Sequence, residues 1–393
     1  MRKELTLMPG KHHASERPSP WLIIAVIIIA AGLIAAGVLL VKEFGGGGRE
    51  PGAVTSDREP LPIVIEATPI PEPTPTSSPT PKPTPTPAPI PDNGEDGYLS
   101  EGIYIWNDMA FELFYGYDEA SDPYARAIDG FARDLPGDVK VYNMIVPNHS
   151  EYGLPKRLRD SMGCNSQRDN IRYIYGTYKY AKGVDVCGTL DQHKGEYIYF
   201  NTDTHWTARG AYYAYEEFCK AADVPCSALE QFGMTAHERD FYGYLAEVTG
   251  EDCLYSNPDH VETFEPGYPY TAGVSYDGYD FTELEGVNSG DASMGYSMFL
   301  WGDQPCVRIK NENSYMNRKL AVVKESYGNA IGAFMGASFD EVYMIDFRSF
   351  EGSLPELVQE HGITDVLFLN SAVAANTYER VEDLRTLFPG SEG

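Results

Sequence analysis

Residues 320–328 read LAVVKESYG and join an apolar run to a serine. Leu320–Val323 is short, apolar and rich in valine, which predicts a buried strand. A helix-compatible run begins near Asn329, so Ser326 falls at a strand-to-helix turn. In open α/β sheets, ligands bind beyond the carboxyl ends of the strands. The placement predicts that Ser326 presents its hydroxyl at the sheet edge, with its backbone N–H near a helix N-terminus and able to stabilise an oxyanion.

A plainer interpretation of Ser326 stays open, because serine is also a preferred helix N-cap. The flanking residues do not form the GxSxG elbow of α/β-hydrolases, since Lys324 occupies the first glycine position. This serine taken by itself therefore does not identify a nucleophile.

Similar short runs rich in Val, Ile and Tyr recur along the chain and alternate with helical stretches. The further predicted strands are Val139–Val146, Val184–Cys187, Tyr197–Phe200, Val342–Asp346 and Val366–Leu369. The predicted helices are Ala208–Ala222, a stretch from Asn329 through Phe334, and Leu354–Glu360. This alternation indicates an α/β domain with a mainly parallel sheet. The irregular, Gly-rich stretch 237–301 holds eight tyrosines and is either an insertion near the active site or ordinary surface loops.

A second segment, Asn201–Trp206, reads NTDTHW and lies between a predicted strand and an amphipathic helix. In an extended segment, residues i and i+2 point to the same side, so Asp203 and His205 can face one way. An aspartate beside a histidine fixes its tautomer and stabilises the imidazolium formed in general-base catalysis. The alternative is a helix N-cap, because Thr and Asp are good capping residues. A third interpretation is a metal site formed by His193, Asp203 and His205, although no HExxH motif supports it.

The N-terminal quarter predicts a membrane anchor and a stalk. Trp21–Val41 is uncharged and mostly apolar, and at ~1.5 Å per residue it spans a ~30 Å hydrocarbon core. The basic residues before it place the N-terminus in the cytoplasm. A Gly/Pro/Thr-rich stretch follows, favouring an extended polyproline stalk. The expected organisation is a cytoplasmic segment 1–20, a transmembrane helix 21–41, an extracellular linker 42–97 and an extracellular catalytic domain 98–393. A long tether suits a Gram-positive cell envelope.

The net charge and the cysteine content further limit the classes of function that fit this chain. The first 20 residues carry +2, so the remainder must carry −30 to give the total of −28. A domain this acidic repels phosphate backbones and anionic lipid surfaces, which argues against nucleic-acid binding. Six cysteines in an exported domain permit three disulfides, with Cys219 and Cys226 as the favoured local pair.

Four stretches resemble the DHHW family, which is related to the alginate O-acetylation proteins and is similar to SGNH hydrolases. They are YFNTDTHWTARGAYYAYEEF (199–218), VYNMIVPNHSEYGLP (141–155), DFYGYLAEVTG (240–250) and IKNENSYMNRKLAVVKESYGNAIGAFM (309–335). The resemblance extends over roughly residues 98–380. Two departures are visible: Glu325 precedes the serine where many relatives have Asp, and the motif Asp-Thr-His-Trp lacks the second histidine of the family name.

The resemblance implies an SGNH-like α/β/α sandwich with a Ser–His–Asp triad. Carried over by motif, Ser326 is the nucleophile, His205 the base and Asp203 its orienting acid. The chain order Asp, His, Ser is a permutation of the order in familiar SGNH esterases. The backbone N–H of Ser326, together with Asn329 or Gly328, is expected to stabilise the oxyanion. Two further candidates for the pocket are Asn311 and Asn313.

The expected function is that of a membrane-tethered serine-dependent O-acyltransferase or acyl esterase, acting on acetyl groups of an extracellular polysaccharide or wall polymer without a cofactor. Transferases of this kind often need a multi-pass membrane partner to bring the acyl group across the bilayer, and the resemblance implies one. The alternative is a catalytically silent envelope protein whose tyrosine-rich segment 237–301 binds glycans.

Overall fold

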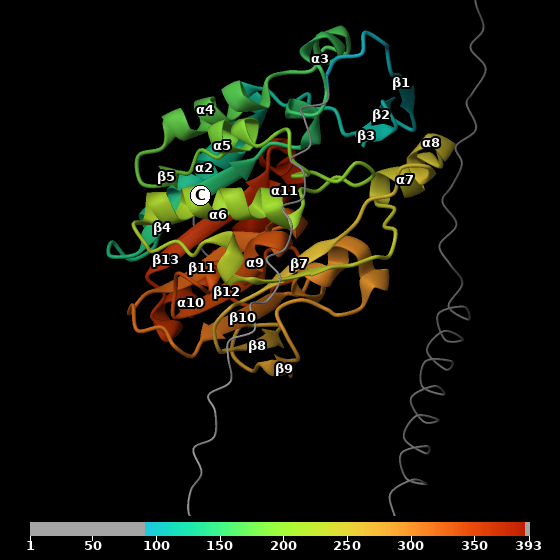
Figure 1. The fold of residues 1–393 in the computed structure, drawn as a ribbon. Helices are drawn as coiled ribbons and strands as arrows, with labels where there is room; N and C mark the ends of the chain where they lie inside the picture. The colour runs from blue at the N-terminus through green and yellow to red at the C-terminus, as the bar shows by residue number, and fades with distance from the viewer. Residues whose placement is uncertain (1–90, 390–393) are drawn as a thin grey trace, which may run out of the picture. The chain divides into compact units, whose positions relative to one another are not determined.

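The structure, a computed structural model, describes residues 91–389 (Figure 1). The segments expected at 1–20 and 21–41, and the linker up to residue 90, lie outside this range. Within residues 91–389, none of the helices is both long and apolar enough to cross a membrane. The first strand begins at Tyr98, where the sequence places the start of the globular domain.

A small antiparallel sheet opens the described chain. Its strands are β1 (Tyr98–Ser100), β2 (Ile103–Trp106) and β3 (Met109–Phe111). Trp106 and Phe111 cluster with Leu158 on one face. Ile105 clusters with Leu245 on the other face. Both faces of β2 and β3 are therefore buried, and residue 112, which follows β3, is held close to the main domain.

An eight-stranded sheet forms the centre of the domain. In spatial order its strands are β5 (Lys182–Gly183), β4 (Lys140–Val146), β13 (Asp365–Ser371), β11 (Lys319–Lys324), β12 (Glu341–Asp346), β10 (Cys306–Asn311), β8 (Tyr270–Ser275) and β9 (Thr282–Leu284). The pairings from β5 to β12 are parallel, and those from β12 to β9 are antiparallel. The sheet is therefore mixed rather than mainly parallel, because β8 and β9 come from the stretch that looked irregular in the sequence.

Helices cover both faces of this sheet and complete an α/β/α sandwich (Figure 1). Side chains alternate across each strand, so Leu367 and Leu369 of β13 pack on one face while Val366 and Phe368 pack on the other. The first face is covered by α6 (Ala208–Ala222) and α9 (Gly332–Met335). The second is covered by α2 (Asp118–Asp134), α4 (Gln167–Thr177), α10 (Leu354–His361) and α11 (Tyr378–Arg385). The predicted α/β class is confirmed.

The remaining elements are short. They are α3 (Lys156–Ser161), α5 (Cys187–Gln192), α7 (Tyr244–Thr249), α8 (Asp252–Tyr255), the ribbon β6 (Gly233–Ala236) with β7 (Glu262–Glu265), and the 3-10 helices η1 (His149–Glu151), η2 (Leu229–Gln231), η3 (Ala292–Trp301), η4 (Ser326–Ile331) and η5 (Ala374–Asn376). Two predicted strands are absent from the main sheet. In the predicted strand Val184–Cys187, residues 184–186 form a loop and Cys187 begins α5. Tyr197–Phe200 contributes only one isolated bridge.

All six cysteines lie within the described residues, and all are free thiols. The three disulfides that their number permits are not formed. Cys187 and Cys306 are buried in the core on one face of the sheet, whereas Cys219 is buried on the opposite face. The favoured partner of Cys219, Cys226, is exposed at the surface and is not bonded to it. The three buried cysteines pack as small apolar side chains.

A buried ion pair lies at the carboxyl end of β11. Lys324, which is 1% exposed, places Nζ 3.0 Å from Oδ2 of Asp346 at the end of β12. Arg348 donates from Nε to Oδ1 of the same carboxylate at 2.8 Å. Burial raises the pKa of Asp346, but the hydrogen bond from Arg348 and the charge of Lys324 outweigh it and hold this pKa below its usual range. The pair explains why a lysine is tolerated where a strand core residue is expected.

Replacing Asp346 with alanine is expected to lower the free energy of unfolding by about 3–5 kcal/mol, because Lys324 is left as an uncompensated buried charge. Urea unfolding measures this loss. The matched control is Asp160→Ala, which breaks an exposed pair with Lys156 and should cost less than ~1 kcal/mol. Since folding lowers the pKa of Asp346, its contribution is present above about pH 4 and is lost as the pH falls through the folded-state pKa. Equal losses in the two variants would contradict a buried pair.

Candidate active site

The segment Asn201–Trp206 forms a tight turn in front of α6. Tyr199 and Trp206 form an antiparallel bridge, and the N–H of Phe200 donates to the carbonyl of His205 at 3.2 Å. The N-cap of α6 is Thr207, whose side chain accepts from the N–H of Gly210. The interpretation of residues 202–204 as the helix cap is therefore wrong, and the side chains of the turn are available for another role.

Three side chains from two distant segments meet in a line. His205 places Nδ1 2.5 Å from Oδ1 of Asp203 and Nε2 2.8 Å from Oγ of Ser326. A carboxylate only accepts hydrogen bonds, so Nδ1 carries the imidazole proton and Nε2 is free to accept from the serine hydroxyl. The structure therefore brings together all three residues expected from sequence, in the order that general-base activation of a serine requires.

Backbone groups fix the acid in place. Asp203 is 4% exposed and accepts from the N–H of Tyr244 at 3.0 Å through Oδ2. Burial raises its pKa, but the charge and hydrogen bonds of His205 and the N–H of Tyr244 outweigh it and lower this pKa overall. Gly243 packs so closely that a Cβ on it would lie 2.3 Å from Cβ of Asp203. Only glycine therefore fits at position 243, because this part of the 237–301 segment packs directly against Asp203.

The residue before the nucleophile joins two strand ends. Glu325 is the N-cap of η4, accepting from the N–H of Tyr327 at 3.1 Å, so Ser326 is not the cap. Its other oxygen accepts from the N–H of Ser371 at the end of β13, at 2.8 Å. Its Oε2 also lies 3.1 Å from Oγ of Ser326. The single hydroxyl proton thus has two acceptors within reach, the carboxylate and His205.

Aromatic side chains tie the two triad segments together. The ring of Tyr296 stacks on His205, with centroids 3.8 Å apart and planes 8° from parallel. Its hydroxyl donates to the carbonyl of Ser326 at 2.9 Å. Trp206 donates from Nε1 to the carbonyl of Tyr327 at 2.8 Å, and the Tyr327 hydroxyl donates to the carbonyl of Thr204. Tyr296 belongs to the 237–301 segment, which the structure therefore places against the site.

Asp259 is the anchor of the turn, and sequence reasoning missed it. This buried carboxylate accepts from the N–H of Asn201 at 2.7 Å and from both the N–H and the hydroxyl of Thr202, at 2.7 and 2.6 Å. It also accepts from the hydroxyl of Tyr197. Burial raises its pKa, and the hydrogen bonds offset part of that rise. No motif indicated its role, because its partners, two backbone N–H groups and two hydroxyls, lie about 60 residues away in the chain.

A further carboxylate approaches the site from β3. Burial raises the pKa of Glu112, and the charge of Glu325 adds to this rise, whereas His205 and Asn148 lower it. Asn148, directly after β4, donates from Nδ2 to the carbonyl of Glu112 at 3.0 Å. Glu112 is thus close enough to interact with both the base and the residue before the nucleophile.

The predicted oxyanion donors differ in whether they already have a hydrogen-bond partner within the protein. The backbone N–H of Ser326 has no acceptor within residues 91–389, so it is available to a ligand. The N–H of Gly328 donates to the carbonyl of Glu325 at 2.9 Å. The side chain of Asn329 is buried and donates to Asp303 at 2.8 Å. Both are next to the nucleophile, but these donor groups already have partners inside the protein.

The structure places Asn311 and Asn313 away from the site. β10 runs antiparallel to β12, and its residue Lys310 pairs with Glu341 at the start of β12. The next residue, Asn311, therefore lies at the amino end of the parallel strands. The triad lies at the opposite, carboxyl edge of the parallel strands. Asn311 donates to the carbonyl of Gly336 at 2.9 Å. The expectation that these two asparagines line the pocket is wrong, because the antiparallel half of the sheet was not foreseen.

The metal alternative finds no matching geometry. His193 places Nδ1 2.8 Å from Glu196 and stacks on Tyr213, whereas both nitrogens of His205 face members of the triad. Among residues 91–389, no three His, Cys, Asp or Glu side chains are arranged to hold a metal ion.

Comparisons with known proteins agree with this picture. The model of the family described as DHHW protein matches residues 91–345. A crystal structure of a DHHW family protein from Eubacterium siraeum is 32% identical in sequence, with a TM-score of 0.68, and the match covers 75% of this chain and 98% of that one. No curated protein is detectably similar by sequence.

Two more distant structures are also similar. Bacillus cereus PatB1 with a sulfonyl adduct has 16% identity and a TM-score of 0.57, and the match covers 71% of this chain and 98% of PatB1. The O-acetyltransferase domain of Pseudomonas putida AlgJ has 15% identity and a TM-score of 0.40, with coverage of 74% and 99%. At 16% identity, the likeness to PatB1 concerns the fold alone.

Replacing Asp259 with asparagine is expected to lower the free energy of unfolding by about 1–3 kcal/mol, because an amide cannot accept from every donor that the carboxylate satisfies. Chemical unfolding tests this, with Asp280→Asn, an exposed aspartate, as the matched control. Unchanged stability would show that the turn is held by other contacts.

Proposed function

The chain belongs to the DHHW family, and on this premise we propose that it is a serine-dependent O-acyltransferase or acyl esterase. Its substrates are acyl groups, foremost acetyl, on an extracellular polysaccharide or cell-wall polymer. The observation that carries the proposal is the linear arrangement of Asp203, His205 and Ser326, with contacts of 2.5 and 2.8 Å. A silent glycan-binding protein has no need to maintain these contacts in a mostly buried setting.

The first half-reaction forms an acyl-enzyme. His205 Nε2 takes the proton from Ser326 Oγ as this oxygen attacks the acyl carbonyl carbon. The backbone N–H of Ser326 stabilises the negative charge on the carbonyl oxygen. His205 then returns its proton to the departing alcohol oxygen, the bond from carbon to that oxygen breaks, and the acyl group is left as an ester on Ser326. Asp203 and the stacked ring of Tyr296 stabilise the imidazolium during these steps.

The second half-reaction removes the acyl group. A sugar hydroxyl or water gives its proton to His205 Nε2 and attacks the ester carbonyl. The tetrahedral intermediate collapses, the bond to Oγ breaks, and Oγ recovers the proton from His205. Transfer to a sugar yields an O-acylated polymer, and transfer to water yields a free acid. The same residues serve both outcomes, so the access of the acceptor decides between them.

The cellular setting is also a proposal, supported by sequence. The apolar segment 21–41 and the Pro-rich stretch after it suit a single-pass anchor and stalk that hold the domain outside the cell membrane of a Gram-positive bacterium. An acyl donor inside the cell would then require a multi-pass membrane partner to deliver the group. The net charge of −28 disfavours nucleic acid as a ligand.

Replacing Ser326 with alanine is expected to abolish both hydrolysis of an aryl acetate and covalent labelling by a sulfonyl fluoride in the full-length protein. His205→Ala should reduce turnover by at least about 10³-fold, and Asp203→Asn by about 10⁴-fold, because the wrong tautomer is stabilised. Intact-mass analysis should detect the acyl or sulfonyl adduct in the wild type.

The matched control is Ser256→Ala, which removes an exposed serine and should retain turnover and labelling. If Ser326→Ala hydrolysed the ester at the wild-type rate, the triad assignment would be rejected. Glycan binding without catalysis would then be the better description of the protein.

A further inference from the structure

A cavity of about 820 Å³ lies beside the triad and has no part in the mechanism above. Its walls come from the segment that follows β4, from α4, and from the chain that leads into the triad turn. The lining residues used below are Glu151, Tyr152, Arg168, Asp191, Tyr197 and Asn201. This volume is within the ~300–1,000 Å³ range of typical ligand sites.

The cavity and the triad share one structural unit. Residues 197–199 and Asn201 line the cavity, and Asp203 comes only two residues further along the same turn. Two residues of extended chain span at most ~7 Å. The segment after β4 also lies at the same carboxyl edge of the parallel strands as Ser326. The cavity is therefore lined by the same turn that carries Asp203 and His205.

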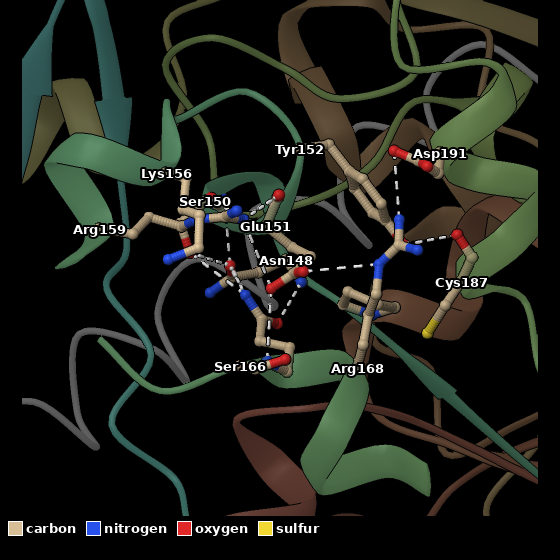
Figure 2. Close-up of polar contacts among 12 residues, drawn as sticks. Asn148, Ser150, Glu151, Tyr152, Lys156, Arg159, Ser166, Arg168, Cys187 and Asp191 are labelled. Atoms are coloured by element: carbon tan, nitrogen blue, oxygen red, sulfur yellow. Dashed lines mark hydrogen bonds and ion pairs between the residues drawn. The ribbon is translucent and has the colours of Figure 1, made fainter. Parts of the chain in front are cut away.

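The lining is rich in charges that are already paired with one another. Arg168 lies between Glu151 and Asp191, at 3.5 and 3.2 Å, and its guanidinium stands 5.4 Å from the ring centroid of Tyr152 (Figure 2). Lys194 pairs with the same Asp191 at 3.0 Å. Five Lys or Arg and four Asp or Glu residues line the cavity, so it is nearly neutral within a chain of net charge −28.

Such a lining fits hydroxyl groups better than ions. A sugar hydroxyl can accept from a guanidinium and donate to a carboxylate at once, which leaves the existing ion pairs intact. A polyanion would have to compete with the paired carboxylates and overcome the negative field of the chain. Tyr152 and Tyr197 add aromatic surface of the amphipathic kind that packs against sugar rings. The side-chain amide of Asn201 makes no hydrogen bond within residues 91–389, so it is free to bind a ligand.

We infer that this cavity binds a neutral oligosaccharide, the strand that carries or accepts the acyl group at Ser326. The inference rests on the proposed function for the role of the strand, but the binding itself does not depend on catalysis. The shared turn, the near-neutral paired lining and the free amide of Asn201 specify a hydroxyl-rich ligand without carboxylates. The cavity thereby selects the acceptor by charge.

Isothermal titration calorimetry on the full-length Ser326→Ala protein separates binding from turnover. The probes are the neutral tetramers chitotetraose, cellotetraose and mannotetraose, and the anionic tetragalacturonate. At least one neutral tetramer should bind, and tetragalacturonate should bind at least about tenfold more weakly. Absence of binding by all three neutral tetramers, or tighter binding of tetragalacturonate, would overturn the inference.

Two variants locate the binding site. Arg168→Ala and Asn201→Ala, each added to the Ser326→Ala background, should weaken binding of the neutral tetramer about tenfold. The matched control is Arg172→Ala on the same helix, whose exposed side chain pairs with Asp169 and lies outside the cavity lining. Because the Asn201 side chain has no internal partner, that variant keeps the test valid if Arg168→Ala fails to fold.

Binding unchanged in both Arg168→Ala and Asn201→Ala would show that the sugar binds elsewhere. Failure of the proposed function gives a different result, namely ester turnover that survives Ser326→Ala. The two hypotheses therefore fail separately.

Discussion

The geometry of this site depends on one buried carboxylate that holds a short turn. Asp259 collects donors from Asn201 and Thr202, so the next residues, Asp203 and His205, are presented from a fixed backbone. Side chains alone would not achieve this, because a histidine in a free loop retains rotational freedom that must be lost in each catalytic cycle. Tyr296 stacks on the face of the His205 ring. The imidazole is thereby held in the orientation that faces Ser326.

The second constraint is the carboxyl edge of the parallel strands. β11 and β13 end side by side, and Glu325 joins their ends through the N–H of Ser371. Below the nucleophile, Lys324 and Asp346 join the ends of β11 and β12 by a buried ion pair. The turn that carries Ser326 is thus braced on both sides of its strand. Such bracing suits preorganised catalysis, because the protein need not reorganise as charge develops.

The sequence predicted those parts of the fold whose signals are local. Helix Ala208–Ala222 was predicted with its observed bounds because its apolar face lies within one short stretch. β11, β12 and β13 were found for the same reason, as apolar runs buried on both faces. The contact between Asp203, His205 and Ser326 could be expected because these residues lie in stretches that resemble a family motif. The sequence did not predict β8, β10, Tyr296 or Asp259. Their roles depend on contacts with residues far away in the chain, and local sequence periodicity does not reveal such contacts.

The order of strands in the sheet has a consequence for how the protein is made. β13 lies between β4 and β11, yet it follows every other strand of this sheet in the chain. A nascent chain that has emerged as far as residue 364 already contains Asp203, His205 and Ser326, but β4 and β11 have no strand between them. The N–H of Ser371 is also missing from Glu325. Such late, non-local pairing is slow, so the turn after β11 gains its hydrogen bond to β13 only when the last strand of the sheet is in place.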